Sequence, residues 1–326
     1  MPFLAAIALI GAGCSESEST NDAATNAEPF ACTPAPEDLD RVDLTPPWSD
    51  VTERQLELRL RREDSRRDTP DGFSRTPVDL TIEQLDGELS FRWASRTTLF
   101  DGLDISATEE RLLEPLIERA PRQVLEYRLD ADRLWIGPDN PDELRENIDD
   151  TYDLLVGLGA FDETLVAEVR QFYAEMPDEQ LALTFAQEPQ IFHSFEGLEL
   201  LVDERFEFPD LVPNAFGGEP FPATTSIWVD ELIDEDGCVR VELQTTPDPE
   251  SFTRILFETL RDAFGNEPDQ AEADELGETF RIETTVVAQF DQGTGFFRSV
   301  STTRFVTDGQ EERVDTRSVL DVTQDE

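Results

Sequence analysis

The feature that most constrains the fold of this chain is an alternation of apolar and polar residues with a period of two. Three runs show it, with apolar side chains at alternate positions of 56–60, 78–82 and 89–93. Because successive side chains of a strand point to opposite faces, each run predicts a half-buried strand. Asp-Gly pairs recur beside these runs, at 71–72, 86–87 and 101–102. Gly accepts the positive φ of a tight hairpin turn, so the runs predict an antiparallel meander.

Helical spacing interrupts this alternation in the middle of the chain. The stretch 141–187 carries apolar residues three and four apart, and a shorter helical stretch follows Asp248. Alternation resumes at residue 200 and again from residue 280 to the C-terminus. The pattern predicts an α+β fold, mainly an antiparallel β-sheet of about eleven strands, curved or a half-barrel, with inserted helices.

The first residues have the pattern of an export signal. An apolar run, Phe3–Ile10, is followed by small residues and then by Cys14. The run is too short to cross a bilayer as a helix, which takes roughly 20 apolar residues. This stretch resembles the signals of bacterial lipoproteins that the lipoprotein signal peptidase processes. The resemblance implies that residues 1–13 are removed, that Cys14 receives a diacylglycerol thioether, and that Ser15 favours sorting to the outer membrane.

Two other interpretations of this terminus stay open: a leader that is not lipidated, and a buried N-terminal strand with a free thiol. Residues 14–47 hold Ser, Asn, Ala, Glu and Pro with few apolar side chains, which predicts a flexible tether with a reach of about 30 Å. The β-rich body is expected to cover 48–326, as one unit or as two lobes, 48–197 and 198–326.

The charge balance of the chain is strongly acidic. It has 26 basic and 74 acidic residues and a formal net charge of −48, and every basic residue is Arg. This excess suits a saline exterior, where screening lengths fall to a few ångström, although an ordinary acidic exported protein with Arg-rich codon usage fits equally well. The charge argues against nucleic acid as a partner, because phosphates require a basic patch.

Three cysteines are present, which agrees with export. With Cys14 assigned to the lipid, Cys32 and Cys238 remain as a candidate disulfide pair, and two free thiols are the alternative. The bond would close a loop of about two hundred residues and stabilise the fold by about 4 to 5 kcal/mol through the entropy of the unfolded chain.

Residues with catalytic or metal-binding patterns are scarce. His193 is the only histidine, so a histidine metal cluster is excluded and a Ser-His-Asp site would have to use this residue. Its aromatic neighbours in the sequence favour a hydrogen-bonded packing role. The acidic runs 139–143 and 234–236 lack the alternate spacing of a calcium loop and indicate solvated turns. The sequence therefore predicts no catalytic residue, no metal site and no cofactor.

The leading functional hypothesis is a non-enzymatic envelope lipoprotein that binds an apolar ligand or an envelope protein. In outline, strands with inserted helices behind a lipidated cysteine are similar to the lipoprotein-carrier half-barrels that shelter acyl chains. This likeness implies an apolar pocket between sheet and helices. Four side chains are expected to line it: Phe91, Trp93, Phe172 and Phe290.

Two alternatives belong to other classes. One is an interaction or scaffold module whose outer sheet face binds a protein or polymer through an exposed apolar patch. The other is a hydrolase that uses two carboxylates in a cleft, one of them with a raised pKa. With 74 acidic residues, such a pair has no recognisable spacing in the sequence.

Overall fold

The computed structural model describes most of the chain beyond its first 31 residues. The described residues are 32–33, 35–36, 39–64, 73–85, 88–96, 98–101, 123–130, 135–159, 163–178, 181, 186–212, 219–249, 281–307 and 312–323, with single positions between 251 and 258. The Asp-Gly pairs at 71–72 and 86–87 lie outside these ranges, as does Gly102.

One antiparallel sheet of twelve strands dominates the described chain. Its order is β7-β6-β4-β3-β2-β14-β13-β12-β11-β10-β9, and β5 pairs with β3 off this path. The strands are β2 (Glu53–Asp64), β3 (Phe73–Leu85), β4 (Glu88–Ser95), β5 (Leu99–Asp101), β6 (Val124–Leu129), β7 (Trp135–Ile136), β9 (Arg205–Val212), β10 (Phe221–Glu231), β11 (Val239–Pro247), β12 (Arg281–Asp291), β13 (Phe296–Thr307) and β14 (Glu312–Asp321). The predicted antiparallel meander and the α+β class are confirmed.

A second, two-stranded sheet pairs β1 (Arg41–Asp43) with β8 (Glu199–Leu201). About eleven strands are expected from the sequence, and the described chain has fourteen, of which β1 and β5 have only three residues each. Strands this short carry too little alternation for the sequence pattern to indicate them.

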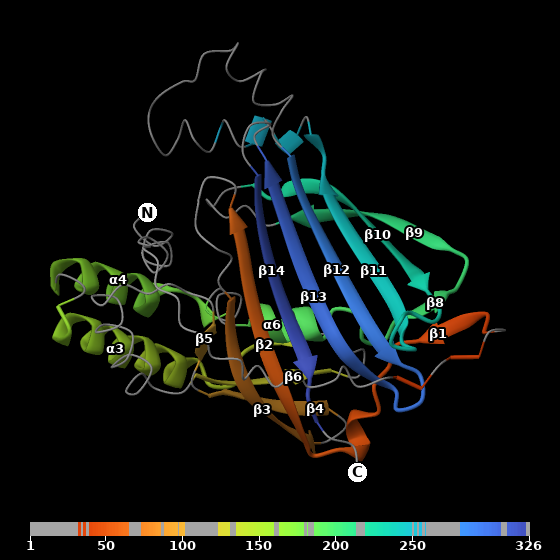
Figure 1. Ribbon diagram of the computed structural model, residues 1–326. Coiled ribbons are helices and arrows are strands. Elements are labelled where there is room, and N and C mark those ends of the chain that lie inside the picture. The colour runs from red at the N-terminus through yellow and green to blue at the C-terminus, as the bar shows by residue number, and fades with distance from the viewer. Residues whose placement is uncertain are drawn as a thin grey trace, which may run out of the picture.

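The large sheet curves around helix α6 (Gln187–Phe192), as Figure 1 shows. Period-two alternation places the apolar side chains of the strands on the inner side, which we call the concave face. These side chains form one core cluster across the sheet, and its members include Leu56, Leu80, Phe91, Tyr127, Val241, Ala288, Val300 and Val319. The cluster contains residues from both predicted lobes, so 48–197 and 198–326 share one sheet and one core.

Two longer helices pack at one side of the curved sheet (Figure 1). Helix α3 (Pro141–Gly157) begins where expected, with Pro141 at its first turn, and buries Leu144 and Ile148. Helix α4 (Glu163–Glu175) lies against it, and the Arg170 guanidinium of α4 is 2.5 Å from Asp153 on α3. No described helix is long and apolar enough to cross a membrane.

The body begins earlier in the chain than the sequence suggests. Val42 and Leu44 are completely buried, and the 3₁₀ turn Trp48–Asp50 buries Trp48. Strand β1 belongs to the core because it pairs with β8 in the register Val42↔Leu200. The predicted tether boundary at residue 47 is therefore too late, since a strand of three residues leaves no visible periodicity.

Candidate functional site

The middle of the concave face is closed by α6 and the turn after it. There, a buried polar chain joins four side chains. The Trp48 Nε1–H donates to Glu196 Oε1 at 2.9 Å, and His193 Nδ1 lies 2.5 Å from the same oxygen. The Tyr127 hydroxyl lies 2.7 Å from His193 Nε2. Because a carboxylate oxygen accepts, the Nδ1–H donates to Glu196 and Nε2 accepts from the tyrosine.

Aromatic rings enclose this chain. The His193 ring centroid lies 4.9 Å from that of Phe91 and 5.3 Å from that of Phe192. Burial, and then the nearby Glu196 carboxylate, raise the pKa of Tyr127 well above its usual value. The side chains of His193 and Glu196 are 4% and 0% exposed, so no substrate reaches them. The structure therefore supports the packing role that the sequence indicates for His193.

Two further carboxylates are buried near the ends of strands. Asp321 lies 3.4 Å from the Arg54 guanidinium, and burial raises its pKa. Asp291 accepts from Arg298 at 2.8 Å. Both side chains are at most 2% exposed, so neither faces a cleft open to solvent. These acids have structural partners, and they do not form the accessible acid pair that the hydrolase alternative requires.

The other part of the concave face, beyond α6, carries arginines. Arg304 on β13 lies directly opposite Asp315 on β14, and Arg313 and Arg317 lie two residues to either side of Asp315. All four share the concave face by the register of the strands. We call these four residues the arginine end. It lies near the last residue of β13, Thr307, at the end of the strands opposite the β12–β13 turn.

Apolar side chains on the concave face remain exposed near the arginine end and at one sheet edge. Leu60 of β2 is 38% exposed and lies opposite Arg317 in the register. On the edge strand β9, Phe206 and Phe208 are 38% and 45% exposed, although their cross-strand partners Ile227 and Thr225 are buried. The sheet thus presents its core-facing side to solvent at these positions, where α6 and the small sheet do not cover it.

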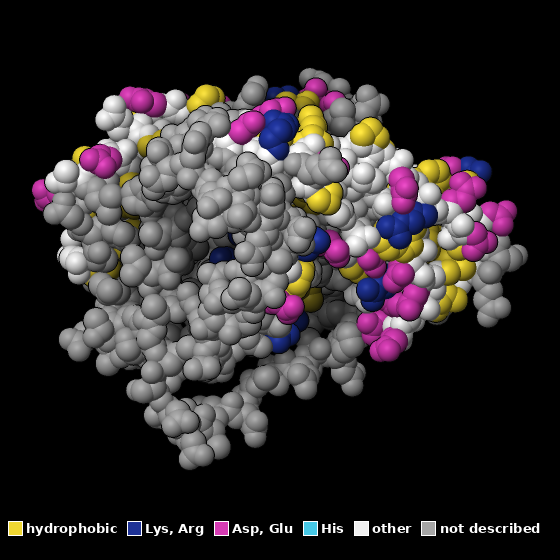
Figure 2. Space-filling view, turned by 90° about the horizontal axis from the view of Figure 1, so that it is seen from above, with side chains coloured by type: hydrophobic (Ala, Val, Ile, Leu, Met, Phe, Trp, Pro, Cys, Tyr) yellow, Lys and Arg dark blue, Asp and Glu magenta, His cyan; other side chains and the backbone are white. Residues whose placement is uncertain are grey.

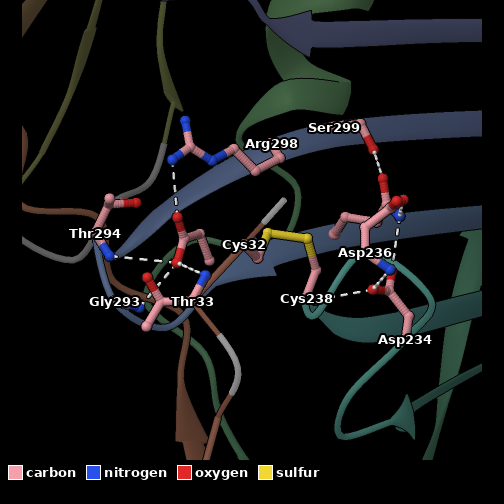
Figure 3. Close-up of a disulfide and its surroundings, with 11 residues drawn as sticks. Cys32, Thr33, Asp234, Asp236, Cys238, Gly293, Thr294, Arg298 and Ser299 are labelled. Carbon is pink, nitrogen blue, oxygen red and sulfur yellow. Dashed lines mark hydrogen bonds and ion pairs between the residues drawn. A yellow bond between two sulfur atoms is a disulfide. The ribbon is translucent and has the colours of Figure 1, made fainter. Parts of the chain in front are cut away.

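A disulfide fastens the start of the described chain to the sheet. Cys32 and Cys238 are bonded, with their Cα atoms 5.0 Å apart, and both are buried. Figure 3 shows the surroundings of this bond, in which the Thr33 N–H donates to Asp291 at 3.1 Å. Burial alone raises the pKa of Asp291, but bonds from Arg298, Gly293, Thr33 and Thr294 outweigh it and hold the pKa below its usual value.

The acidic turn beside the disulfide is explained by its own hydrogen bonds. Asp234 Oδ1 accepts from the backbone N–H of Asp236 and of Cys238, at 2.9 and 2.8 Å. Gly237 completes the turn at a φ of 82°, a conformation that glycine adopts without strain. Within the described chain, no group of three or more potential metal ligands comes together.

Three of the four predicted pocket residues belong to the solid core. Phe91, Trp93 and Phe290 are at most 3% exposed and are packed by other side chains. Phe172 is 55% exposed on α4, so the prediction that it lines a pocket with the other three is wrong. The physical reason is the helix face: α4 buries Val166, Val169 and Tyr173, and Phe172 lies at the margin of that stripe. Cys14 lies outside the described residues.

The arginine end is the candidate functional residue set that sequence analysis missed. Its arginines alternate with other residues as ordinary strand positions do, and no motif marks them. The only sequence signal is polar residues at inward positions of β13 and β14, which becomes visible once the register is known.

Comparison with known proteins adds little to this geometry. The sequence matches no family model and no curated protein sequence. Among solved structures, it is similar to one that concerns lipid–protein interactions in lipovitellin, with a TM-score of 0.39 and 6% identity. The match covers 83% of this chain and 25% of that chain, so this chain spans about a quarter of that length. A TM-score this low does not establish a common fold.

Proposed function

We propose that this protein is a membrane-anchored, extracytoplasmic lipoprotein that binds an apolar ligand on the uncovered part of its concave face. One observation carries the binding proposal: Leu60, Phe206 and Phe208 lie on the core-facing side of the sheet and are 38% to 45% exposed. Water contact with apolar surface is unfavourable by about 25 cal/mol per Å², so an acyl chain that covers these side chains gains stability. The proposed ligand class is therefore a molecule with a long acyl chain.

The anchor proposal is supported by the leader and by the disulfide. The apolar run before Cys14 has the pattern of a lipoprotein signal, and a disulfide suits an oxidising compartment. We place the protein in the cell envelope, at the outer membrane in preference to the inner one. The disulfide lies by the β12–β13 turn, whereas Arg304 lies eight residues further along β13, roughly 25 Å away. This geometry directs the arginine end away from the anchored end of the body.

Binding is tested with oleyl alcohol, a neutral molecule with one long chain. We expect saturable displacement of a fluorescent acyl probe from the wild-type protein, and loss of displacement in Leu60→Asp, because a charge in the apolar contact is unfavourable. Ile233→Asp is the matched control, since Ile233 is 40% exposed in the β10–β11 turn and Leu60 is 38% exposed. Circular dichroism establishes that both variants fold. No saturable binding by the wild type, or equal binding by all three proteins, contradicts the proposal.

The anchor is tested separately, by labelling cells with a palmitate analogue. We expect label on the wild-type protein and none on Cys14→Ser. Label on both proteins removes Cys14 as the attachment site and leaves the binding proposal untouched.

A further inference from the structure

One arginine of the arginine end has no ion-pair partner in the described structure. The Arg313 Nε–H donates to Asp315 at 2.9 Å, and Arg317 donates to Glu188 of α6 at 2.7 Å. No hydrogen bond or ion pair joins Arg304 to another described side chain. The chain has 74 acidic and only 26 basic residues, so a cation that pairs with no carboxylate among the described side chains is unusual here.

The local charge at this place is positive within a strongly negative protein. Arg304, Arg313 and Arg317 contribute three positive charges, and Asp315 and Glu188 contribute two negative ones. The register also pairs Arg62 of β2 with Asp315. Arginines therefore outnumber carboxylates among these residues, which favours an anionic ligand.

Arg304 is exposed to solvent but is partly surrounded by protein. Burial lowers the pKa of Arg304, Asp315 raises it, and repulsion from Arg313 and Arg317 lowers it further. On the face seen in Figure 2, dark blue, magenta and yellow side chains lie close together, so charged and apolar groups share this surface.

A neighbouring hydroxyl is also without a partner. Thr302 precedes Arg304 by two residues on β13, so both side chains lie on the concave face. The Thr302 Oγ1 atom is buried and makes no hydrogen bond within the described structure. A buried hydroxyl without a partner is unfavourable by about 1–3 kcal/mol. A ligand oxygen between Thr302 and Arg304 would give this hydroxyl an acceptor.

We propose that the arginine end binds the carboxylate of a long-chain fatty acid, with Arg304 as the main donor and the acyl chain directed toward Leu60. This inference rests on the proposed binding of an acyl chain to the concave face. Leu60 lies two strands from Arg304, roughly 10 Å across the sheet, which an acyl chain spans readily. A guanidinium presents two parallel N–H groups to the two oxygens of a planar carboxylate.

The charge count distinguishes a fatty acid from other apolar ligands. A fatty acid carries a negative charge that the arginines attract, whereas a fatty alcohol carries none. The rest of the protein repels anions, so an anion that binds here does so through these short-range contacts.

The test compares oleate with oleyl alcohol, which has the same chain without the charge. We expect the wild-type protein to bind oleate at least about tenfold more tightly, the ratio that a charge-assisted hydrogen bond supports. In Arg304→Gln this preference is expected to disappear, while the affinity for oleyl alcohol stays unchanged. Arg59→Gln is the matched control, because Arg59 is on the opposite face of β2 and pairs with Glu57 at 2.6 Å.

Each outcome has a separate meaning. Equal affinities for oleate and oleyl alcohol, or unchanged oleate binding in Arg304→Gln, overturn the inference and leave the acyl-chain proposal standing. Binding of neither ligand overturns both. An anionic phospholipid that binds more tightly than oleate, and loses this affinity in Arg304→Gln, overturns the fatty-acid assignment.

Discussion

The concave face has two regions that differ in whether their polar side chains are buried with partners or exposed. Under α6, Trp48 and His193 donate to Glu196, and the Tyr127 hydroxyl donates to His193, among enclosing aromatic rings. At the arginine end, Arg304 is exposed and has no ion pair within the described chain. The closed region has the properties of a core, where polar groups are buried only with partners. The open region leaves a cation and apolar side chains in contact with solvent, as the proposed ligand site requires.

The largest contrast is expected in stability after truncation of an apolar side chain. Phe91→Ala should lower the free energy of unfolding by about 3–5 kcal/mol, because it leaves a cavity among packed rings. Leu60→Ala should lower it by less than about 1 kcal/mol, because Leu60 is 38% exposed. Urea denaturation followed by tryptophan fluorescence measures both. Equal losses would show that the two regions are packed alike.

The second contrast concerns carboxylates. Glu196→Ala should destabilise the protein by about 2–5 kcal/mol, since it leaves the Trp48 and His193 donors buried without an acceptor. Glu188→Gln, which affects the half-buried pair with Arg317, should change stability by less than about 1 kcal/mol. The same denaturation experiment compares them. A small effect of Glu196→Ala would mean that water replaces the carboxylate.

A third prediction concerns how stability depends on pH at the end of the sheet that carries the disulfide. The pKa of Asp291 is lower in the folded state than in the unfolded state, where it is about 3.9. The ionised carboxylate therefore stabilises the fold above the unfolded pKa. This stabilisation is lost as the pH falls through the pKa of the folded state. Asp291→Asn should destabilise the protein by about 1–2 kcal/mol at pH 7. The difference from wild type should shrink below about pH 4. A difference that is constant with pH contradicts the assigned role.

The smallest expected effect is on ligand affinity. Glu188→Gln removes the carboxylate that pairs with Arg317, so the net charge around the arginine end becomes more positive by one unit. Oleate affinity should rise about two- to fivefold, while oleyl alcohol affinity stays the same. The displacement assay with the two ligands measures this ratio. Weaker oleate binding in the variant would mean that Glu188 itself supports the site.

The alternation of apolar and polar residues predicts the sheet correctly but does not indicate the arginine end, and both outcomes have a physical cause. Inward positions such as Phe91 and Val300 follow from a period of two, because strand geometry fixes that period. The arginine end depends on register between β13 and β14, which no local pattern contains. Phe172 shows that helical spacing is also insufficient by itself. The spacing places Phe172 beside the buried stripe of α4, but tertiary packing decides which residues of a broad apolar stripe are buried by other elements.

Photo-crosslinking with a fatty acid that carries a diazirine near its carboxylate tests the central claim most directly. The account predicts saturable labelling of the peptide that contains Arg304, competed by oleate and lost in Arg304→Gln. Labelling that does not saturate, or that concentrates at exposed apolar residues elsewhere, such as Phe172 on α4, would contradict it.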